Sequence, residues 1–253
     1  MRIEDIDPPR EQKGASAAIL KSLESHGLHW DGEVRYQSQR NHAYNSALSW
    51  LEKEELIYPC NCTRKRLHPL NGHYDGHCRL HPPTPNQAAA LRLKVGNVPP
   101  PYAHISSDII FEDQFKGIIK EALKQSSGDF IIHRKDGLFA YQLAVVVDDI
   151  DQGITHIVRG DDLLDTTAKQ IYLFRLLGQT PPKYGHIPVI KDHHGNKLSK
   201  QNHAPALKNQ QAVLNLIKAC TELNIPLVNK NAGDYATSDE VIAAAMTSLS
   251  GPS

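Results

Sequence analysis

A nearly unbroken apolar run, FAYQLAVVVD at residues 139–148, constrains the fold of this chain more than any other feature. Short apolar runs of this kind are typical of strands buried on both faces, as in parallel sheets covered by helices. We therefore predict a strand that ends at Asp148 and Asp149. Because ligands bind beyond the carboxyl ends of such strands, polar residues at strand ends are the first candidates for a functional site.

Other strands and helices alternate with this run along the chain. Apolar residues spaced three or four apart predict helices at 13–27, at 38–56 with Ser38 as N-cap, and at 163–177. Strands are predicted at 1–7, in 104–123 (with a short helix), and at 129–134, 154–159 and 186–190. This alternation indicates an α/β fold with a parallel sheet. The charged residues at predicted strand ends are Glu4, Asp148, Asp149, Arg159, Asp161 and Asp162.

Three of the four cysteines lie close together in a segment rich in histidine and proline, residues 58–103. The C-x-C pair Cys60 and Cys62, with Cys78 after a turn, suits a closed tetrahedral zinc site that stabilises structure. His73, Tyr74 and His77 are candidates for the fourth ligand. The alternative is three reduced cysteines in a loop. Four cysteines in a chain of 253 residues do not form a disulfide scaffold.

The charge balance argues against a dedicated, strongly basic nucleic-acid binder, because Lys plus Arg and Asp plus Glu each number 28. A local basic patch is still compatible with that balance. No apolar run in the sequence approaches the length of about 18 residues that a membrane helix requires. Its first residues, MRIEDIDPPRE, lack the apolar centre of a signal peptide. We expect a cytoplasmic protein with no membrane association.

The stretch HGNKLSKQNHAPAL at residues 194–207 places Lys197 and Lys200 on either side of a Leu-Ser pair, with Gly195 just before. Two ammonium groups on a glycine-containing loop are suited to stabilising negative charge on a phosphate. Taken alone, the stretch is equally compatible with a solvated turn. The other motifs decide between these interpretations.

Four segments together resemble the catalytic domain of the glutamyl-tRNA synthetases, a class I synthetase family. They are RIEDID at 2–7, DFIIHRKDGLFAYQLAVVVDD at 129–149, GITHIVRGDDLLDTTAKQIYLFRLLG at 153–178 and KLSKQNHAPAL at 197–207. They follow the order of that family. The resemblance implies a Rossmann-like parallel sheet with a small zinc-bearing insertion, and an aminoacyl-tRNA synthetase-like ligase.

Within that family, the chain resembles a short branch that has no anticodon-binding domain. The pattern C-x-C…Y-x-x-x-C and the few residues after the last motif, 208–253, carry this resemblance. It implies that ATP, with Mg²⁺, activates L-glutamate as an adenylate, which is then transferred to the queuosine base of tRNA(Asp). It also implies a monomer, and a zinc ion bound by Cys60, Cys62, Tyr74 and Cys78.

The resemblance also assigns roles to single residues. Glu4 would contact the α-amino group of glutamate, and Arg159 would pair with its side-chain carboxylate, which a planar guanidinium can bind through two hydrogen bonds. Tyr141 would hold the amino acid through its hydroxyl, although a tyrosine in an apolar run is often only part of the core. Lys200 would act on ATP and the departing pyrophosphate, with Lys197 assisting.

Four regions follow from the resemblance: the N-terminal part of the catalytic domain at 1–57, the zinc-bearing insertion at 58–103, the rest of the catalytic domain at 104–207, and a helical extension at 208–253. The family's preceding strand and helix, with the HIGH-type motif, have no counterpart in the sequence, so we expect the contacts they make to be missing. The chain is then either a truncated form of a working enzyme or an inactive remnant that serves as a zinc-bearing RNA- or protein-binding module.

Overall fold

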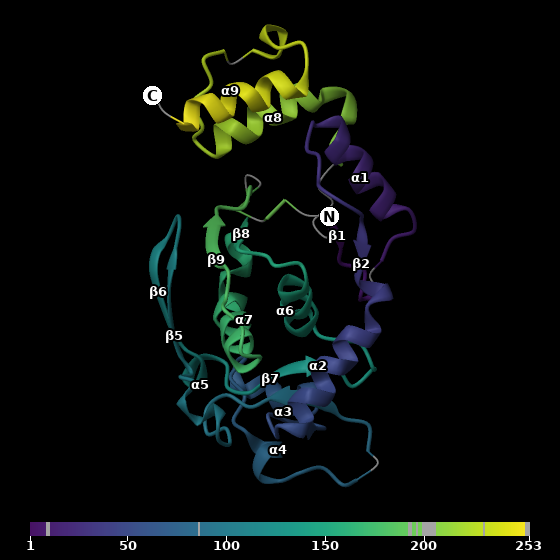
Figure 1. Cartoon of the computed structure of the whole chain (residues 1–253), viewed down its shortest axis with the longest axis vertical. Helices are drawn as coiled ribbons and strands as arrows, with labels where there is room; N and C mark the ends of the chain where they lie inside the picture. The colour runs from purple at the N-terminus through teal and green to yellow at the C-terminus, as the bar shows by residue number, and fades with distance from the viewer. Residues whose placement is uncertain are drawn as a thin grey trace. The chain divides into compact units, whose positions relative to one another are not determined.

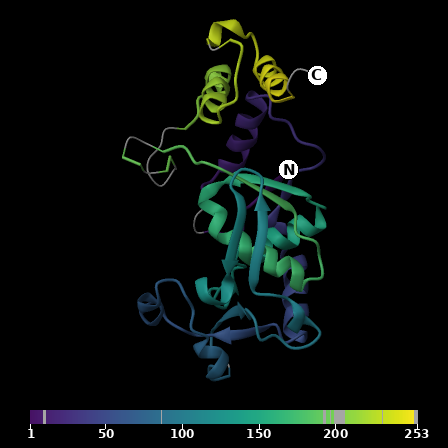
Figure 2. The same ribbon diagram turned by 90° about the vertical axis from the view of Figure 1, so that its left-hand side faces the viewer.

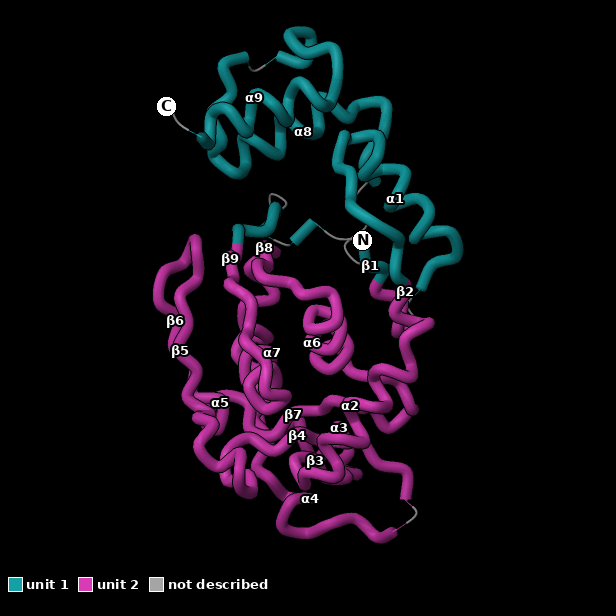
Figure 3. Tube along the Cα trace, viewed as in Figure 1, with its two compact units in different colours: residues 1–3, 8–35, 187–253 teal, residues 4–7, 36–186 magenta. Residues whose placement is uncertain are grey.

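The computed structural model describes residues 1–8, 11–85, 87–191, 194–195, 197–198, 206–229 and 231–250. The chain divides into two compact units, coloured separately in Figure 3. Unit 1 contains residues 1–3, 8–35 and 187–253, and unit 2 contains residues 4–7 and 36–186. Most strands and the largest buried core belong to unit 2.

The larger sheet of unit 2 has four strands in the order β6-β5-β9-β8. Strands β5 (Asp108–Asp113) and β6 (Gly117–Ala122) form an antiparallel hairpin, seen side by side in Figure 2. Strand β9 (Lys183–Ile187) runs parallel to β5 and neighbours β8 (His156–Gly160). The helix α7 (Leu164–Leu176) connects β8 to β9 (Figure 1), an α/β connection as the sequence predicts.

A second, antiparallel sheet of unit 2 has the order β3-β4-β7. It is formed by β3 (Ile57–Cys60), β4 (Ala90–Leu93) and β7 (Phe130–His133). Side chains alternate between its faces. Ile57 and Leu93 belong to the main core of the unit, whereas Tyr58 and Cys60 belong to a separate small cluster with Tyr74 and Cys78. This sheet therefore separates the main core from the cysteine cluster.

The apolar run at 139–148 forms a helix, α6 (Tyr141–Asp151), so the predicted strand is wrong. Every residue from Leu143 to Asp149 is buried, because α6 packs against α2 (Asn41–Lys53), α7 and β7. A helix covered on all sides needs no polar face, and its sequence then looks like that of a buried strand. Asp148 and Asp149 consequently lie inside this helix rather than at a strand end.

The other predicted elements differ from the structure mainly at their ends. The helices α1 (Ala15–Ser25) and α7 confirm two predictions, and Ser38 lies in a 3-10 turn before α2, so it is not the N-cap of that helix. Its backbone N–H and its hydroxyl instead donate to Asp5. Residues 104–123 form a hairpin where one strand and a helix were predicted, with α5 (Leu123–Ser126) after it.

Unit 1 has a small core of its own between α8 (Ala212–Glu222) and α9 (Ser238–Ser250). The strand β1 (Arg2–Ile3) pairs with β2 (Arg35–Tyr36) in a two-stranded sheet.

Two short helices, α3 (Arg64–Leu67) and α4 (His77–Leu80), belong to the cysteine-containing segment of unit 2. Across the described residues, every helix is too short or too polar to span a bilayer.

Candidate functional site

Arg159 lies on β8, and other side chains of unit 2 hold one edge of its guanidinium group. Its Nε–H donates to Nε2 of His186 at 3.1 Å, and its Nη2 donates to the hydroxyl of Thr167 at 2.8 Å. The guanidinium carbon lies 5.4 Å from the centre of the Tyr184 ring. Within the described part of the chain, the Nη1 group has no hydrogen-bond partner. Arg159 is thus oriented, with one end of its guanidinium left for a ligand.

The orientation of Arg159 depends on a buried pair behind it. Nδ1 of His186 lies 2.5 Å from Oδ2 of Asp113, and both side chains are fully buried. Because a carboxylate only accepts, His186 donates from Nδ1, which leaves Nε2 to accept from Arg159. Burial acts to raise the pKa of Asp113, but hydrogen bonds from the His186 ring and from three backbone N–H groups outweigh it and lower that pKa. Strands β5, β9 and β8 each contribute one residue to this chain of contacts.

Tyr141 begins α6 and is half-buried against the main core. Its charge influences the pKa of Tyr184. Burial raises the pKa of Tyr184 most, Arg159 lowers it, and Asp149 and Tyr141 raise it. Tyr141 and Arg159 thus both contribute to the electrostatic surroundings of Tyr184. The sequence analysis did not single out Tyr184, His186 or Asp113. The signals in their favour were the strands predicted within 104–123, which contains Asp113, and at 186–190, which begins at His186.

Glu4 is exposed and follows β1, in the short segment 4–7 that belongs to unit 2. This segment is attached to its unit at two points. Asp5 accepts from Ser38, and Asp7 accepts from Arg134 at 3.3 Å. The structure fixes the chain around Glu4, and its contact with a substrate remains a prediction.

The lysine motif belongs to unit 1. Lys197 is exposed and forms an isolated antiparallel bridge with Lys191, next to a hydrogen bond from the Leu198 N–H to the Ile190 carbonyl at 2.9 Å. Gly195 has a φ of +81°, a conformation that glycine adopts without strain. Lys191 and Lys197 therefore lie side by side in antiparallel backbone segments. Lys200 lies outside the residues that the structure describes.

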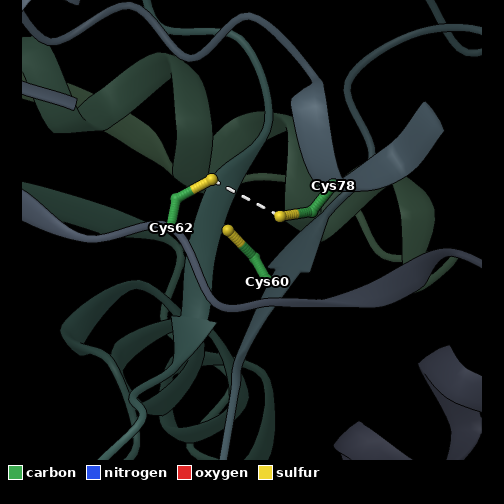
Figure 4. Close-up of side chains that lie close together, drawn as sticks. All are labelled: Cys60, Cys62 and Cys78. Carbon is green, nitrogen blue, oxygen red and sulfur yellow. Dashed lines mark hydrogen bonds between the residues drawn. The ribbon is translucent and has the colours of Figure 1, made fainter. Parts of the chain in front are cut away.

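The three cysteines predicted to bind metal lie together, as Figure 4 shows. Their sulfur atoms are all within 4.8 Å of one another, with Cys62 and Cys78 at 3.4 Å. The Oη atom of Tyr74 lies 3.4 Å from Sγ of Cys60 and 3.7 Å from Sγ of Cys62. A zinc ion about 2.3 Å from sulfur and about 2.0 Å from oxygen requires separations of about 3.5 to 3.8 Å between tetrahedral ligands. The separations of Cys62 from Cys78 and of Tyr74 from Cys60 and Cys62 fit such an ion, and the other sulfur atoms lie within 4.8 Å.

The neighbouring histidines do not join this cluster. Nε2 of His73 lies 3.1 Å from the carbonyl oxygen of Lys124, and the ring of His77 stacks on that of His81. Among the described residues, the only group of cysteine, histidine and acidic side chains placed to hold a metal is the three cysteines. Of the three candidates for a fourth ligand, the geometry therefore favours Tyr74.

Contacts inside the cluster make the four groups unequal. Burial acts to raise the pKa of Cys60, but hydrogen bonds from Tyr74 and Arg92 lower it overall. Burial and then the hydrogen bond with Cys78 raise the pKa of Cys62. Burial and the contact with Cys60 raise the pKa of Tyr74. Of these three groups, Cys60 is the one whose surroundings favour the ionised form.

The fold and the arrangement of Arg159 and the three cysteines can now be compared with those of known families. The chain belongs to the class I tRNA synthetases (E and Q), catalytic domain, whose family model matches residues 1–213.

Relatives with known names narrow the comparison. The chain is 53% identical over 208 residues to the glutamyl-Q tRNA(Asp) synthetase of Escherichia coli strain K12. The aligned region covers 82% of this chain and 64% of that protein. It is 51% identical over 227 residues to the protein of the same name from Yersinia pseudotuberculosis, covering 90% of this chain and 66% of that one. The chain therefore spans about two thirds of the length of these relatives.

A solved structure agrees on the fold. The glutamate tRNA ligase of Elizabethkingia meningosepticum superposes with a TM-score of 0.72 at 19% identity, over 96% of this chain and 57% of that one. The α/β fold with a parallel sheet that the sequence predicts is thus the fold of a class I synthetase catalytic domain.

Proposed function

We propose that the protein activates L-glutamate with ATP and transfers it to the queuosine base of tRNA(Asp) in the cytoplasm. The observation that carries the proposal is the identity of 53% with relatives named for this reaction. The α-carboxylate of glutamate attacks the α-phosphate of ATP, which forms glutamyl adenylate and releases pyrophosphate. A nucleophilic group of the queuosine base then attacks the acyl carbon and releases AMP.

Arg159 selects glutamate in this proposal. Its outer end donates two parallel hydrogen bonds to the side-chain carboxylate, one from Nη1 and one from the Nη2 N–H that otherwise makes only long contacts with Leu163 and Thr166. This favours an acid over its amide. The support is the engagement of the opposite edge by His186 and Thr167. Glu4 pairs with the α-ammonium group, and the hydroxyl of Tyr141 holds the same end of the amino acid.

Lys200, assisted by Lys197, stabilises the negative charge that develops on pyrophosphate as it leaves. Mg²⁺ arrives with ATP. Preorganised ammonium groups near this charge lower the barrier because they are in place before it develops. The support for Lys197 is its antiparallel bridge to Lys191, with Gly195 in the left-handed conformation.

Cys60, Cys62, Tyr74 and Cys78 hold a zinc ion that stabilises the inserted segment. Four protein ligands leave no open position, so the ion's contribution is to the fold and not to the reaction. The segment around the cluster has few apolar residues of its own: among the described residues, only Tyr58 and Leu67 join the four ligands in this small cluster. Removal of the metal is therefore expected to loosen α3 and α4.

The test is binding of glutamyl-sulfamoyl-adenosine, a stable analogue of the adenylate, measured by calorimetry on the 253-residue chain. We expect binding that Arg159→Lys weakens about 10- to 100-fold, because a lysine cannot make the two parallel hydrogen bonds. Arg175→Lys, at the last turn of α7, is the control and should bind as the original chain does.

Glutamate-dependent ATP–pyrophosphate exchange, with the E. coli relative as positive control, tests the chemistry itself. Exchange that requires glutamate and is not supported by glutamine supports the proposal. A folded, zinc-loaded chain that neither binds the analogue nor catalyses exchange would contradict it, and the binding-module alternative would then be preferred.

A further inference from the structure

Arg92 is a buried arginine at a position where an apolar residue is expected. It lies in β4 between Leu91 and Leu93, and only 6% of it is exposed. Its pairing partner across the sheet is Tyr58, as Ala90 is the partner of Cys60, so Arg92 shares the sheet face of the cysteine cluster. Burying an isolated guanidinium is costly unless another charge or a set of acceptors compensates it. Its partners should therefore reveal why the residue is there.

Two of those partners, Cys60 and Tyr74, are among the four proposed metal ligands. Nε of Arg92 donates to Sγ of Cys60 at 3.2 Å, and its guanidinium carbon lies 3.7 Å from the centre of the Tyr74 ring. Nη1 donates to the backbone carbonyl of Asp129 at 2.7 Å. Within the described chain, no carboxylate lies at ion-pair distance from Arg92. The charge of Arg92 therefore faces the cysteine cluster rather than an acidic side chain.

The proposed ligand set requires such a cation. Three thiolates around Zn²⁺ leave one excess negative charge, even when tyrosine contributes a neutral oxygen. In a buried site that charge is expensive, because few water molecules are near enough to stabilise it. A guanidinium that contacts a sulfur and stacks on the phenol ring neutralises the excess charge and fixes both ligands in orientation.

We propose that Arg92 is the counter-ion of the metal cluster, and that it positions Cys60 and Tyr74 for zinc. The inference rests on the proposed zinc site and is independent of the proposed reaction. Arg79 offers a matched comparison. Arg79 lies in the same segment, is partly buried, and donates to the carboxylate of Asp129 at 3.5 Å, but its other hydrogen bonds go to the carbonyls of Gly96 and Asn97.

The experiment measures the zinc affinity of the whole chain by competition with a chromophoric chelator. We expect Arg92→Met, which keeps an unbranched apolar chain but removes the charge and the donors, to lower the affinity about 10- to 100-fold, as loss of such a supporting contact does in other metal sites. Arg92→Lys keeps the charge without the fork of donors, so its zinc affinity should lie between those of the original chain and Arg92→Met. Arg79→Met should bind zinc as the original chain does.

Cobalt(II) in place of zinc shows whether the ligands themselves have changed. The charge-transfer bands of three cobalt–thiolate bonds should persist in Arg92→Met once enough metal is added. Equal affinities of the original chain and Arg92→Met would overturn the proposal, as would an equal loss in Arg79→Met. If Arg92→Met does not fold, Arg92→Lys takes its place. A zinc affinity of Arg92→Lys equal to that of the original chain would then contradict the proposal that the guanidinium positions Cys60 and Tyr74. Failure of the original chain to bind zinc would instead contradict the site.

Discussion

At the scale of single residues, the buried pair of Asp113 and His186 determines how Arg159 is held. Asp113 accepts four hydrogen bonds, from the ring and the backbone N–H of His186 and from the backbone N–H groups of Phe115 and Lys116. All of them favour the ionised carboxylate. The pair therefore links the stability of the larger sheet to the position of the arginine.

This pair predicts a particular dependence of stability on pH. The pKa of Asp113 is lowered from its ordinary 3.8, so its contribution to folding is present above about pH 4 and is lost as the pH falls through the lowered value. Asp113→Asn lacks this contribution, and at neutral pH it should be less stable by about 1.5 to 3 kcal/mol, the typical worth of hydrogen bonds to a buried charge. Urea unfolding from neutral pH to below about pH 4 measures this.

The difference between Asp113→Asn and the original chain should shrink toward the acid end of that series. Asp136→Asn, at an exposed carboxylate that pairs with Arg134, is the control and should change stability little. A difference that stays constant down to the lowest pH would show that the variant acts through packing and not through the charge of Asp113.

How far single residues could be predicted depends on their distance along the chain. Cys60, Cys62, Tyr74 and Cys78 lie in one short segment, and the structure brings all four together. Asp113 and His186 are 73 positions apart, and no local pattern connects them. Such pairs form only when strands distant in the sequence become neighbours in a sheet. Local spacing therefore predicts the group of three cysteines, to which the family resemblance adds Tyr74, but not the support of Arg159.

At the scale of elements, the segments predicted to be helices from amphipathic periodicity are helices near their predicted positions, whereas the fully apolar one forms a helix where a strand was predicted. Helix α1 has an exposed and a half-buried side, and its period was readable. Helix α6 is buried on every side, and Asp148 inside it accepts from Gln37, Arg40 and Tyr44. These contacts with the region of α2 satisfy a charged residue within the core. A period gives no information where every face is covered.

A glycine contact ties the cysteine-containing segment to the sheet beside it. Gly128 has a φ of +64°, and a Cβ atom there would lie 2.1 Å from the carbonyl oxygen of Tyr74. The backbone N–H of Tyr74 donates to the carbonyl of Ser127 at 2.8 Å, so the backbone segments around Tyr74 and Gly128 are in direct contact. Any side chain at 128 must displace the segment that carries Tyr74.

We therefore expect Gly128→Ala to lower zinc affinity as well as stability. Gly137→Ala is the matched control, because Gly137 also has a positive φ, +86°, but open space where the Cβ would lie. The strain of the left-handed conformation should cost each variant about 1 to 2 kcal/mol. Only Gly128→Ala adds a clash at Tyr74, so it should unfold at lower temperature and lose zinc to a chelator more readily. Equal zinc affinity in the two variants would mean that this contact does not position Tyr74.

At the scale of the whole molecule, the two units have separate apolar cores. In unit 1 the core consists of Ile217, Cys220, Leu227 and Val241, and none of them belongs to the main core of unit 2. Groups of residues that share no core can open independently and do so with different free energies. The division of the chain could not be predicted from composition, since the units alternate along the sequence.

This arrangement predicts that damage to one core stays within its unit. Val241 is fully buried in α9, so Val241→Asp places an uncompensated charge in the core of unit 1 and should unfold it. Hydrogen exchange read by mass spectrometry should then show loss of amide protection in α8 and α9, while β3, β4 and β7 keep theirs and zinc remains bound. Val228→Asp is the control, because Val228 is 92% exposed and the same change there should leave protection unaltered. Ile132→Asp, in the core of unit 2, should give the reverse pattern. Loss of protection in both units from either core variant would show that they unfold as one cooperative body.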